Sequence, residues 1–258
     1  MKRVFVTGVA AMLACLLLPV HAQDAAAPNG KPGAQLPEKF EKQVTVTRKA
    51  NYLLYLPKHY GEDAQKKWPV ILFLHGSGER GADINLVKLH GPPKVVEKGR
   101  DLPFVIVSPQ CPEGKWWDPH VVVSLLDEII AKYNVDADRV YLTGLSMGGY
   151  GTWETAVTYP DRFAAIAPIC GWGNRYRLPE IRHVPTWIFH GDKDQAVPAA
   201  AGIEMAETLK RLGGDVRLTR YPDAGHDSWT VTYDNRALYD WFLQHKRAAR
   251  PAAAGAAR

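Results

Sequence analysis

Residues 141–150 have the sequence YLTGLSMGGY, and the architecture of the chain can be inferred outward from them. The stretch begins with β-favouring residues, turns through glycines around one serine, and continues into 150–156 (YGTWETA), which is typical of a helix. Its centre fits G-x-S-x-G, the nucleophile elbow, in which a strand reverses into a helix and presents a strained, exposed serine. Side chains at the two glycines, Gly144 and Gly148, would collide across such a turn. A simple Gly-Ser turn is the alternative, and residues elsewhere in the chain decide between the two.

Strands and helices alternate along the rest of the chain. Apolar runs predict strands, several of them buried on both faces of a parallel sheet, at 70–74, 104–108, 140–143, 163–168, 186–190 and 216–221. An alternating pattern predicts a further strand at 43–47 with a hairpin partner at 51–57. Helices are predicted at 121–133, 149–159, 199–212 and 237–246. This order predicts an α/β fold with a mostly parallel sheet flanked by helices and no separate lid domain.

The chain has 258 residues, of which 46% are hydrophobic and 23% charged, enough for one large domain with a full core. We expect this domain to cover residues 38–246. Residues 23–37 are rich in Ala, Pro and Gly and predict a disordered linker, and residues 247–258 predict a disordered, basic, Ala-rich tail.

Residues 1–22 have the pattern of a secretory signal peptide: two basic residues, a largely apolar run, and small residues at the cleavage position. The apolar run is short for a membrane span and contains Pro19. Met12-Leu13-Ala14-Cys15 loosely resembles a lipobox, but the apolar run continues beyond Cys15, which disfavours lipidation. We therefore expect a secreted or periplasmic protein with no stable membrane association after signal cleavage.

The basic character of the chain lies at its ends. Residues 1–22 hold two basic and no acidic residues, so their removal lowers the net charge from +5 to +3. Without the four basic residues after His245 as well, the domain is near −1. Such a charge distribution does not indicate a nucleic-acid partner.

A serine hydroxyl becomes a nucleophile only beside a base, and that base needs an orienting carboxylate. After a nucleophile elbow these partners follow in the order acid, then histidine, each on a loop behind a later strand. Asp194, in HGDKDQAVP at 190–198, is the predicted acid; Asp192 is the rival, with a turn-forming role more typical of its position. His226, in DAGHDSW at 223–229, is the predicted base.

Two other histidines, His75 and His190, each precede a glycine at a strand end, and we interpret them as structural. The oxyanion formed by attack of Ser146 requires preorganised donors. The N–H of Met147, at a helix N-terminus, is one predicted donor, and the N–H of Ser77, with Gly78 as the alternative, is the other. The glycines around Ser77 could also suggest phosphate binding, but the Lys-Ser/Thr pair of a P-loop is missing.

Four motifs follow one another along the chain: HGSGERG, GLSMGG, HGDKDQAVP and GHDSW. Over roughly residues 40–244 they resemble the α/β-hydrolase family. Leu89-His90-Gly91-Pro92-Pro93, Ser108-Pro109-Gln110-Cys111-Pro112 and the GHDSW segment make the chain similar to its secreted esterase and predicted peptidase branch, and to polyhydroxybutyrate depolymerases and feruloyl or acetylxylan esterases. The resemblance implies that the serine strand lies between the strand before HGSGERG and the strand that ends at Cys170.

That implied order bears on the two cysteines outside the signal peptide, Cys111 and Cys170. They would follow strands three positions apart, about 14 Å at ~4.8 Å per strand. A disulfide needs Cα atoms within roughly 7 Å, so only excursions of the loops could join them. The chain contains neither Cys-x-x-Cys nor His-Glu-x-x-His, and we expect no metal site and no cofactor.

Aromatic and polar residues at the same sheet edge are candidates for substrate contact, because ligands bind at the carboxyl ends of the strands. We predict an apolar or planar wall and name as substrate-binding residues Gly78, Gln110, Trp117, Trp172 and Trp229. Trp116 lies on the same loop as Trp117. Polar residues such as Gln110 also often tie a loop together.

Together these predictions indicate a serine esterase that acts through an acyl-enzyme on a small-molecule or saccharide-linked ester. A serine peptidase with the same triad is one alternative, although peptidases of this fold often carry an added propeller or cap. The other alternative is a non-catalytic binding protein, which would be free to lose one of the three residues Ser146, Asp194 and His226.

Overall fold

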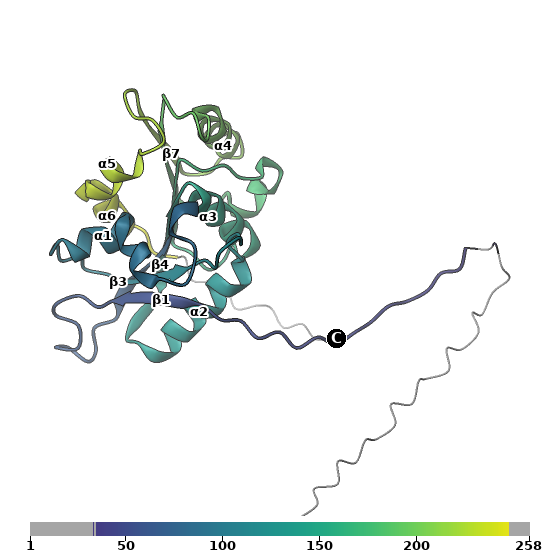
Figure 1. The fold of residues 1–258 in the computed structure, drawn as a ribbon, viewed down its shortest axis with the longest axis horizontal. Coiled ribbons are helices and arrows are strands. Elements are labelled where there is room, and N and C mark those ends of the chain that lie inside the picture. Colours follow the sequence, from purple (N-terminus) through teal and green to yellow (C-terminus); the bar gives the residue numbers. More distant parts are fainter. Residues whose placement is uncertain (1–32, 34, 248–258) are drawn as a thin grey trace, which may run out of the picture. The chain divides into compact units, whose positions relative to one another are not determined.

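The computed structural model describes residue 33 and residues 35–247. Its centre is a seven-stranded sheet with the order β1-β3-β2-β4-β5-β6-β7 (Figure 1). The strands are β1 (Asn51–Tyr55), β2 (Trp68–Leu74), β3 (Val105–Gln110), β4 (Val135–Leu145), β5 (Ala165–Ile169), β6 (Thr186–Gly191) and β7 (Val216–Tyr221). Only the β1–β3 pair is antiparallel, so the fold predicted from the alternation of strands and helices is confirmed.

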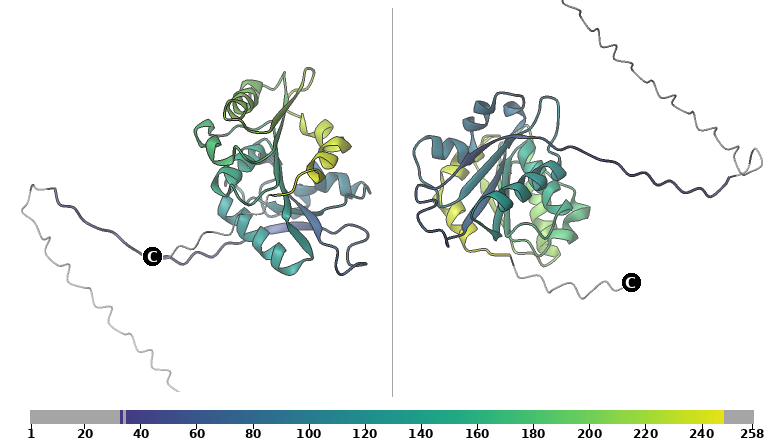
Figure 2. Two further views of the ribbon diagram at one scale, coloured as in Figure 1. Left: turned by 180° about the vertical axis from the view of Figure 1, so that it is seen from behind. Right: turned by 90° about the horizontal axis from the view of Figure 1, so that it is seen from below.

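Helices cover both faces of the sheet, as two further views show (Figure 2). One face carries α2 (Pro119–Lys132), α3 (Met147–Thr158) and α4 (Ala199–Arg211). The other carries α1 (Gly91–Glu97), α5 (Trp229–Asp234) and α6 (Arg236–Leu243). Single-turn or slightly longer 3-10 helices lie at η1 (Ser77–Glu79), η2 (Ile84–Leu89) and η3 (Arg175–Ile181). The short helices α1 and α5 were not expected from the sequence pattern.

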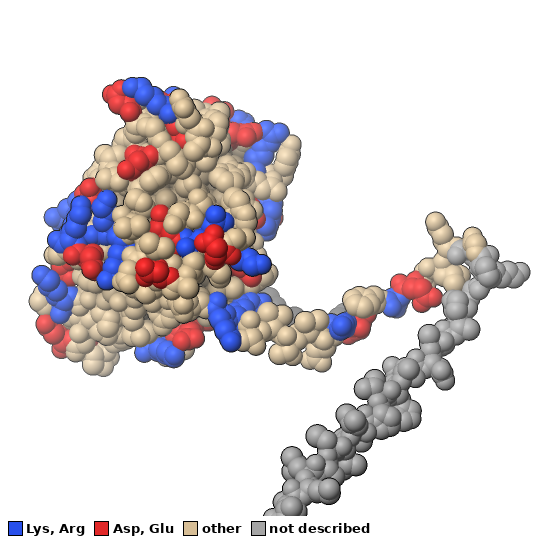
Figure 3. All heavy atoms as spheres, viewed as in Figure 1, with Lys and Arg blue, Asp and Glu red and all other residues tan. Residues whose placement is uncertain are grey.

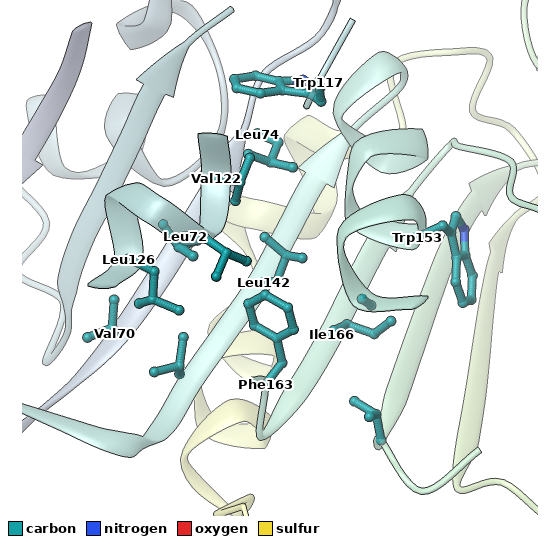
Figure 4. Close-up of a cluster of buried hydrophobic side chains, with 14 of the residues drawn as sticks. Val70, Leu72, Leu74, Trp117, Val122, Leu126, Leu142, Trp153, Phe163 and Ile166 are labelled. Atoms are coloured by element: carbon teal, nitrogen blue, oxygen red, sulfur yellow. The ribbon is translucent and has the colours of Figure 1, made fainter. Parts of the chain in front are cut away.

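The core explains why β2 is continuously apolar. Every residue of Trp68–Leu74 is buried, because alternate side chains pack into the two layers of helices. Figure 4 shows one of these layers, where Leu72 and Leu142 of the sheet lie against helical residues Val122 and Leu126. Burial on both faces fixes the central strands, whose carboxyl ends then carry the candidate functional residues.

The strand predicted at 43–47 is wrong. Residues 35–50 form neither helix nor strand, and Val44 and Val46 are 67% and 61% exposed. The predicted hairpin partner does form a strand, β1, but it pairs with β3. Alternation specifies which side chains would share a face, and it supplies no partner strand. The compact unit that contains the sheet begins at Thr47.

The surface mixes the two signs of charge. On the face shown in Figure 3, Lys and Arg side chains are interspersed with Asp and Glu, without a large area of one sign. Within residue 33 and residues 35–247, none of the helices is long and apolar enough to span a bilayer. The predicted signal peptide, residues 1–22, lies outside the described residues.

Candidate active site

Ser146 occupies a strained turn between β4 and α3. Its φ of 52° and ψ of −115° lie in a region that non-glycine residues rarely adopt, and its N–H donates to the Ile169 carbonyl at 2.9 Å. A Cβ at Gly148 would lie 1.9 Å from the Leu74 carbonyl oxygen, and one at Gly144 would lie 2.3 Å from the Gly148 oxygen. The predicted collision across the turn is therefore present at Gly144, whereas at Gly148 a side chain would collide with the neighbouring strand β2. Close backbone approach at both glycines holds the serine in place.

His226 bridges Ser146 and Asp194. Its Nε2 lies 2.9 Å from Ser146 Oγ, and its Nδ1 lies 2.7 Å from Asp194 Oδ2. A carboxylate only accepts hydrogen bonds, so the neutral ring carries its proton on Nδ1 and can accept the serine proton at Nε2. The three side chains come from the turns after β4, β6 and β7, which the parallel sheet brings to one edge.

Asp194 is held from its other side by backbone. Its Oδ1 accepts from the N–H groups of Ala196 and Val197, both at 2.9 Å, and the side chain is fully buried. These bonds leave Oδ2 for His226. The rival acid, Asp192, instead pairs with Arg220 at 2.7 Å, and both side chains are partly exposed. The structure thus brings Asp194, and not Asp192, to the histidine.

The two predicted oxyanion donors follow neighbouring strands, Ser77 after β2 and Met147 after β4. Met147 is buried as the first residue of α3, so its N–H has no acceptor within the helix and lies at the positive end of the helix dipole. Ser77 begins η1 and is exposed, as is Gly78, where a Cβ would meet no atom within 4 Å. The Glu79 carboxylate accepts from the Gly76 N–H at 2.9 Å and orders the start of this loop.

His75 and His190 bond backbone groups, as expected for structural histidines. His75 is fully buried, with Nδ1 2.6 Å from the Gly76 carbonyl and Nε2 accepting from the Cys111 N–H at 2.9 Å. Burial lowers the pKa of His75 to about 4, so the ring stays neutral. His190 Nε2 lies 2.8 Å from the Val197 carbonyl, in the same loop that carries the predicted acid.

Gln110 and Trp117, both predicted to contact substrate, are buried and bonded to backbone carbonyls. Gln110 is 4% exposed and donates to the carbonyls of Glu79 and Asp83 at 2.9 and 2.8 Å. Trp117 is 7% exposed and donates from Nε1 to the His75 carbonyl at 3.1 Å. Both residues line a cavity of about 230 Å³. Their polar groups hold the loops after β2 and β3, and a role in substrate binding stays a prediction for both residues.

Aromatic side chains gather around Tyr150, in the helix that follows Ser146, and against His226, in a set that differs partly from the predicted one. Trp172 contacts Trp116 and Tyr150, with ring centroids 5.9 and 5.3 Å apart, and Trp116 is 54% exposed. Tyr150 lies one helical turn beyond Ser146, a spacing from which the sequence could have placed it on the same face. Trp229 packs perpendicular to His226, with centroids 5.3 Å apart. Trp172 and Trp229 therefore remain candidates for substrate contact.

Cys170 lies beneath this site. It is fully buried with a φ of 40°, and burial raises the pKa of its thiol to about 12. Cys170 and Cys111 are both free, at the ends of β5 and β3, which stand three positions apart in the sheet as expected.

Ligand atoms of Cys170, Asp194 and His226 lie within 4.8 Å of one another, the type of group that could hold a metal ion. The 2.7 Å contact between His226 and Asp194 has hydrogen-bond geometry.

The sheet order and the residues at its carboxyl edge define an α/β-hydrolase. The phospholipase/carboxylesterase family matches residues 120–235. A poly(3-hydroxyoctanoate) depolymerase of Pseudomonas fluorescens is 25% identical over 69% of this chain and 74% of its own. A bifunctional acetylxylan esterase/xylanase of Neocallimastix patriciarum is 30% identical over 50% of this chain and 20% of its own.

A solved structure of a thermostable esterase is 32% identical, with a TM-score of 0.66 over 76% of this chain and 59% of its own. The chain thus spans well under two thirds of the fungal enzyme and slightly under two thirds of the thermostable esterase. The chain has the α/β-hydrolase fold and is similar to esterases, and the resemblance drawn from its four motifs is confirmed.

Proposed function

We propose that this chain is a serine esterase that works through an acyl-enzyme. Ser146 attacks the ester carbonyl while His226 takes its proton, and His226 then returns that proton to the leaving alcohol. Asp194 holds the imidazole in the required tautomer and stabilises its cation. The N–H groups of Met147 and Ser77 stabilise the oxyanion. In the second half-reaction His226 activates water, which releases the acid and restores Ser146.

The observation that carries this proposal is the unbroken line of contacts from Ser146 Oγ to Asp194 Oδ2. Its two distances, 2.9 and 2.7 Å, join residues that are 80 and 32 positions apart in the chain. A second support is the strained backbone of Ser146, which the close packing of Gly148 against β2 maintains. A turn with no catalytic role would need neither these side-chain contacts nor the strained backbone.

We propose a small or saccharide-linked ester as the substrate. The related proteins named above include a polyester depolymerase and an acetylxylan esterase, whose names describe oxygen esters. The partly exposed aromatic rings of Trp116, Tyr150 and Trp172 offer an apolar surface beside the serine, which suits a ring or an acyl chain. Residues 1–22 have the pattern of an export signal, and we propose a secreted or periplasmic enzyme.

The first experiment compares hydrolysis of p-nitrophenyl acetate, p-nitrophenyl octanoate and methyl ferulate by the protein, Ser146→Ala and the control Ser124→Ala. We expect Ser146→Ala to abolish both turnover and labelling by a fluorophosphonate, and the control to behave as the parent. Equal turnover in all three proteins, or no turnover and no labelling in any, would exclude the proposal and favour a binding protein.

A peptidase is separated from an esterase by matched ester and amide substrates with the same acyl group. The proposal predicts much faster ester hydrolysis, because an amine must be protonated as it leaves. Export is tested by expression of the full chain and N-terminal sequencing of the mature protein. A new N-terminus at Gln23 supports the signal peptide, and retention of residues 1–22 contradicts it.

A further inference from the structure

His90 and Glu79 lie between β2 and α1 and have no part in the mechanism above. Glu79 ends η1, the 3-10 helix that begins with Ser77, and is 6% exposed. His90 links η2 to α1 and makes no capping hydrogen bond to that helix. The His90 side chain is therefore directed toward something other than its own helix, whereas Glu79 caps η1 with one carboxylate oxygen and leaves the other for a further contact.

His90 binds the indole of Trp229, which lies 139 positions further along the chain. Trp229 Nε1 donates to His90 Nδ1 at 3.2 Å, and the two ring centroids lie 5.4 Å apart. Because Nδ1 accepts this bond, the neutral His90 ring carries its proton on Nε2. That Nε2 faces Glu79 Oε1 at 3.6 Å, so the buried carboxylate favours the tautomer that Trp229 requires.

The same carboxylate also holds the loop of the proposed oxyanion donor. Its second oxygen, Oε2, accepts from the Gly76 N–H at 2.9 Å, one residue before Ser77. Glu79 therefore contacts both the start of the donor loop and the histidine that binds Trp229. A shift of this one carboxylate would disturb both segments.

Trp229 restrains His226 in a direction that the triad partners leave free. Ser146 and Asp194 contact the two ring nitrogens of His226, so both hydrogen bonds lie near the plane of the imidazole. These bonds only weakly resist rotation of the ring about the line that joins the two nitrogens. The indole packs on this ring at an interplanar angle of 88°, with centroids 5.3 Å apart. An edge-to-face contact of this kind opposes such a tilt.

We propose that His90, oriented by Glu79, is a positioning residue that holds Trp229 against His226 and so keeps the general base aligned with Ser146. This role rests on the proposed esterase function. It adds a residue that touches neither substrate nor reacting atoms, and it couples the loop after β2 to the loop after β7.

The kinetic test compares four variants with p-nitrophenyl acetate, whose small acyl group limits changes in KM. We expect His90→Phe and Trp229→Phe each to lower kcat about tenfold, because small misplacements of a catalytic group are costly. The double variant should lose no more than either single one, because both remove the same contact. His90→Asn places an amide oxygen near the position of Nδ1 and should recover kcat to within about threefold of the parent.

A second readout does not depend on turnover. The indole N–H resonance of Trp229, assigned by its loss in Trp229→Phe, should exchange with water about ten times faster in His90→Phe and at the parental rate in His90→Asn. Equal melting temperatures of parent and His90→Phe would separate this loss from unfolding.

The outcomes distinguish the two proposals. Fluorophosphonate labelling of the parent together with unchanged kcat in His90→Phe, or additive losses in the double variant, would overturn the positioning role and leave the esterase intact. Failure of the parent to label at Ser146 would overturn the proposed function and the positioning role with it.

Discussion

The two sides of the candidate active site use polar side chains differently. We call the segments after β6 and β7, residues 190–198 and 223–229, the base side, and the segments after β2 and β3, residues 75–90 and 110–118, the donor side. On the base side, Asp194 bonds its own loop and still directs one oxygen to His226, whose side chain is 28% exposed.

On the donor side three polar side chains are turned inward. His75, Glu79 and Gln110 are 0%, 6% and 4% exposed, and each bonds to backbone groups. The base side thus presents side-chain chemistry, whereas the donor side uses these side chains to shape a backbone on which Ser77 and Gly78 are exposed. Polar residues at the same sheet edge can therefore serve opposite purposes, and burial with a backbone partner distinguishes them.

Replacement of the acid should give the largest effect and should act on the base side alone. Asp194→Asn keeps an oxygen for the N–H groups of Ala196 and Val197 but favours the wrong tautomer of His226, so we expect kcat to fall about 10⁴-fold with little change in melting temperature. Asp192→Asn is the matched control and should retain kcat within about threefold. Similar losses in both variants would contradict the assignment of Asp194.

Gly148 packs the nucleophile turn against the end of β2, where the donor side begins, and its replacement should disturb both the turn and the donor side. A Cβ there would lie 1.9 Å from the Leu74 carbonyl, so Gly148→Ala must displace β2 or α3 and should cost more than about 4 kcal/mol in unfolding free energy. Gly78→Ala, where a Cβ meets no atom within 4 Å, should leave stability nearly unchanged. Urea denaturation of both variants measures the difference, and equal midpoints would refute the packing argument.

The donor side should make stability depend on pH through His75. Its pKa is about 4 in the folded protein and about 6.5 when unfolded, so the unfolded state binds more protons between these values. The contribution of His75 to the free energy of unfolding is fully present above pH 6.5. It is lost as the pH falls toward 4, by up to about 3 kcal/mol.

Melting temperatures of the parent and of His75→Gln between pH 7 and 4.5 test this dependence. The variant cannot titrate at this position and should show a shallower decline than the parent. His183→Gln, which changes a largely exposed histidine, should keep the parental slope. A parental slope in His75→Gln would show that other groups produce the dependence.

The smallest effect is expected from Gln110, whose donors connect β3 to the loop after η1. Gln110→Leu leaves the carbonyls of Glu79 and Asp83 without these bonds and should cost about 2 kcal/mol, or roughly 5 °C in melting temperature. Gln244→Leu changes an exposed glutamine and should cost much less. If Gln110→Leu raised KM for every ester without loss of stability, the original prediction of substrate contact would regain support.

Local sequence could predict the elbow because the G-x-S-x-G spacing marks a turn whose glycines permit close backbone approach. The glycines at 144 and 148 are required by backbone approach within a few residues and against β2, and the strand and helix beside them follow from residue patterns. The parallel sheet follows from alternation of apolar runs with helices, and it places Ser146, Asp194 and His226 at one edge whatever the details of the loops. The same reasoning failed at 43–47, where alternation was present but no partner strand was available.

Only the tertiary structure decided which side chains at that edge face inward. Gln110 and Trp117 are residue types that often line binding sites. Their hydrogen-bond partners, however, are backbone carbonyls brought close by the packing of neighbouring loops. The contact between His90 and Trp229 joins residues 139 positions apart and has no motif of its own. Motif spacing specifies residues whose geometry is set within one turn, whereas the direction of a loop side chain depends on which hydrogen-bond partner the whole fold brings within reach.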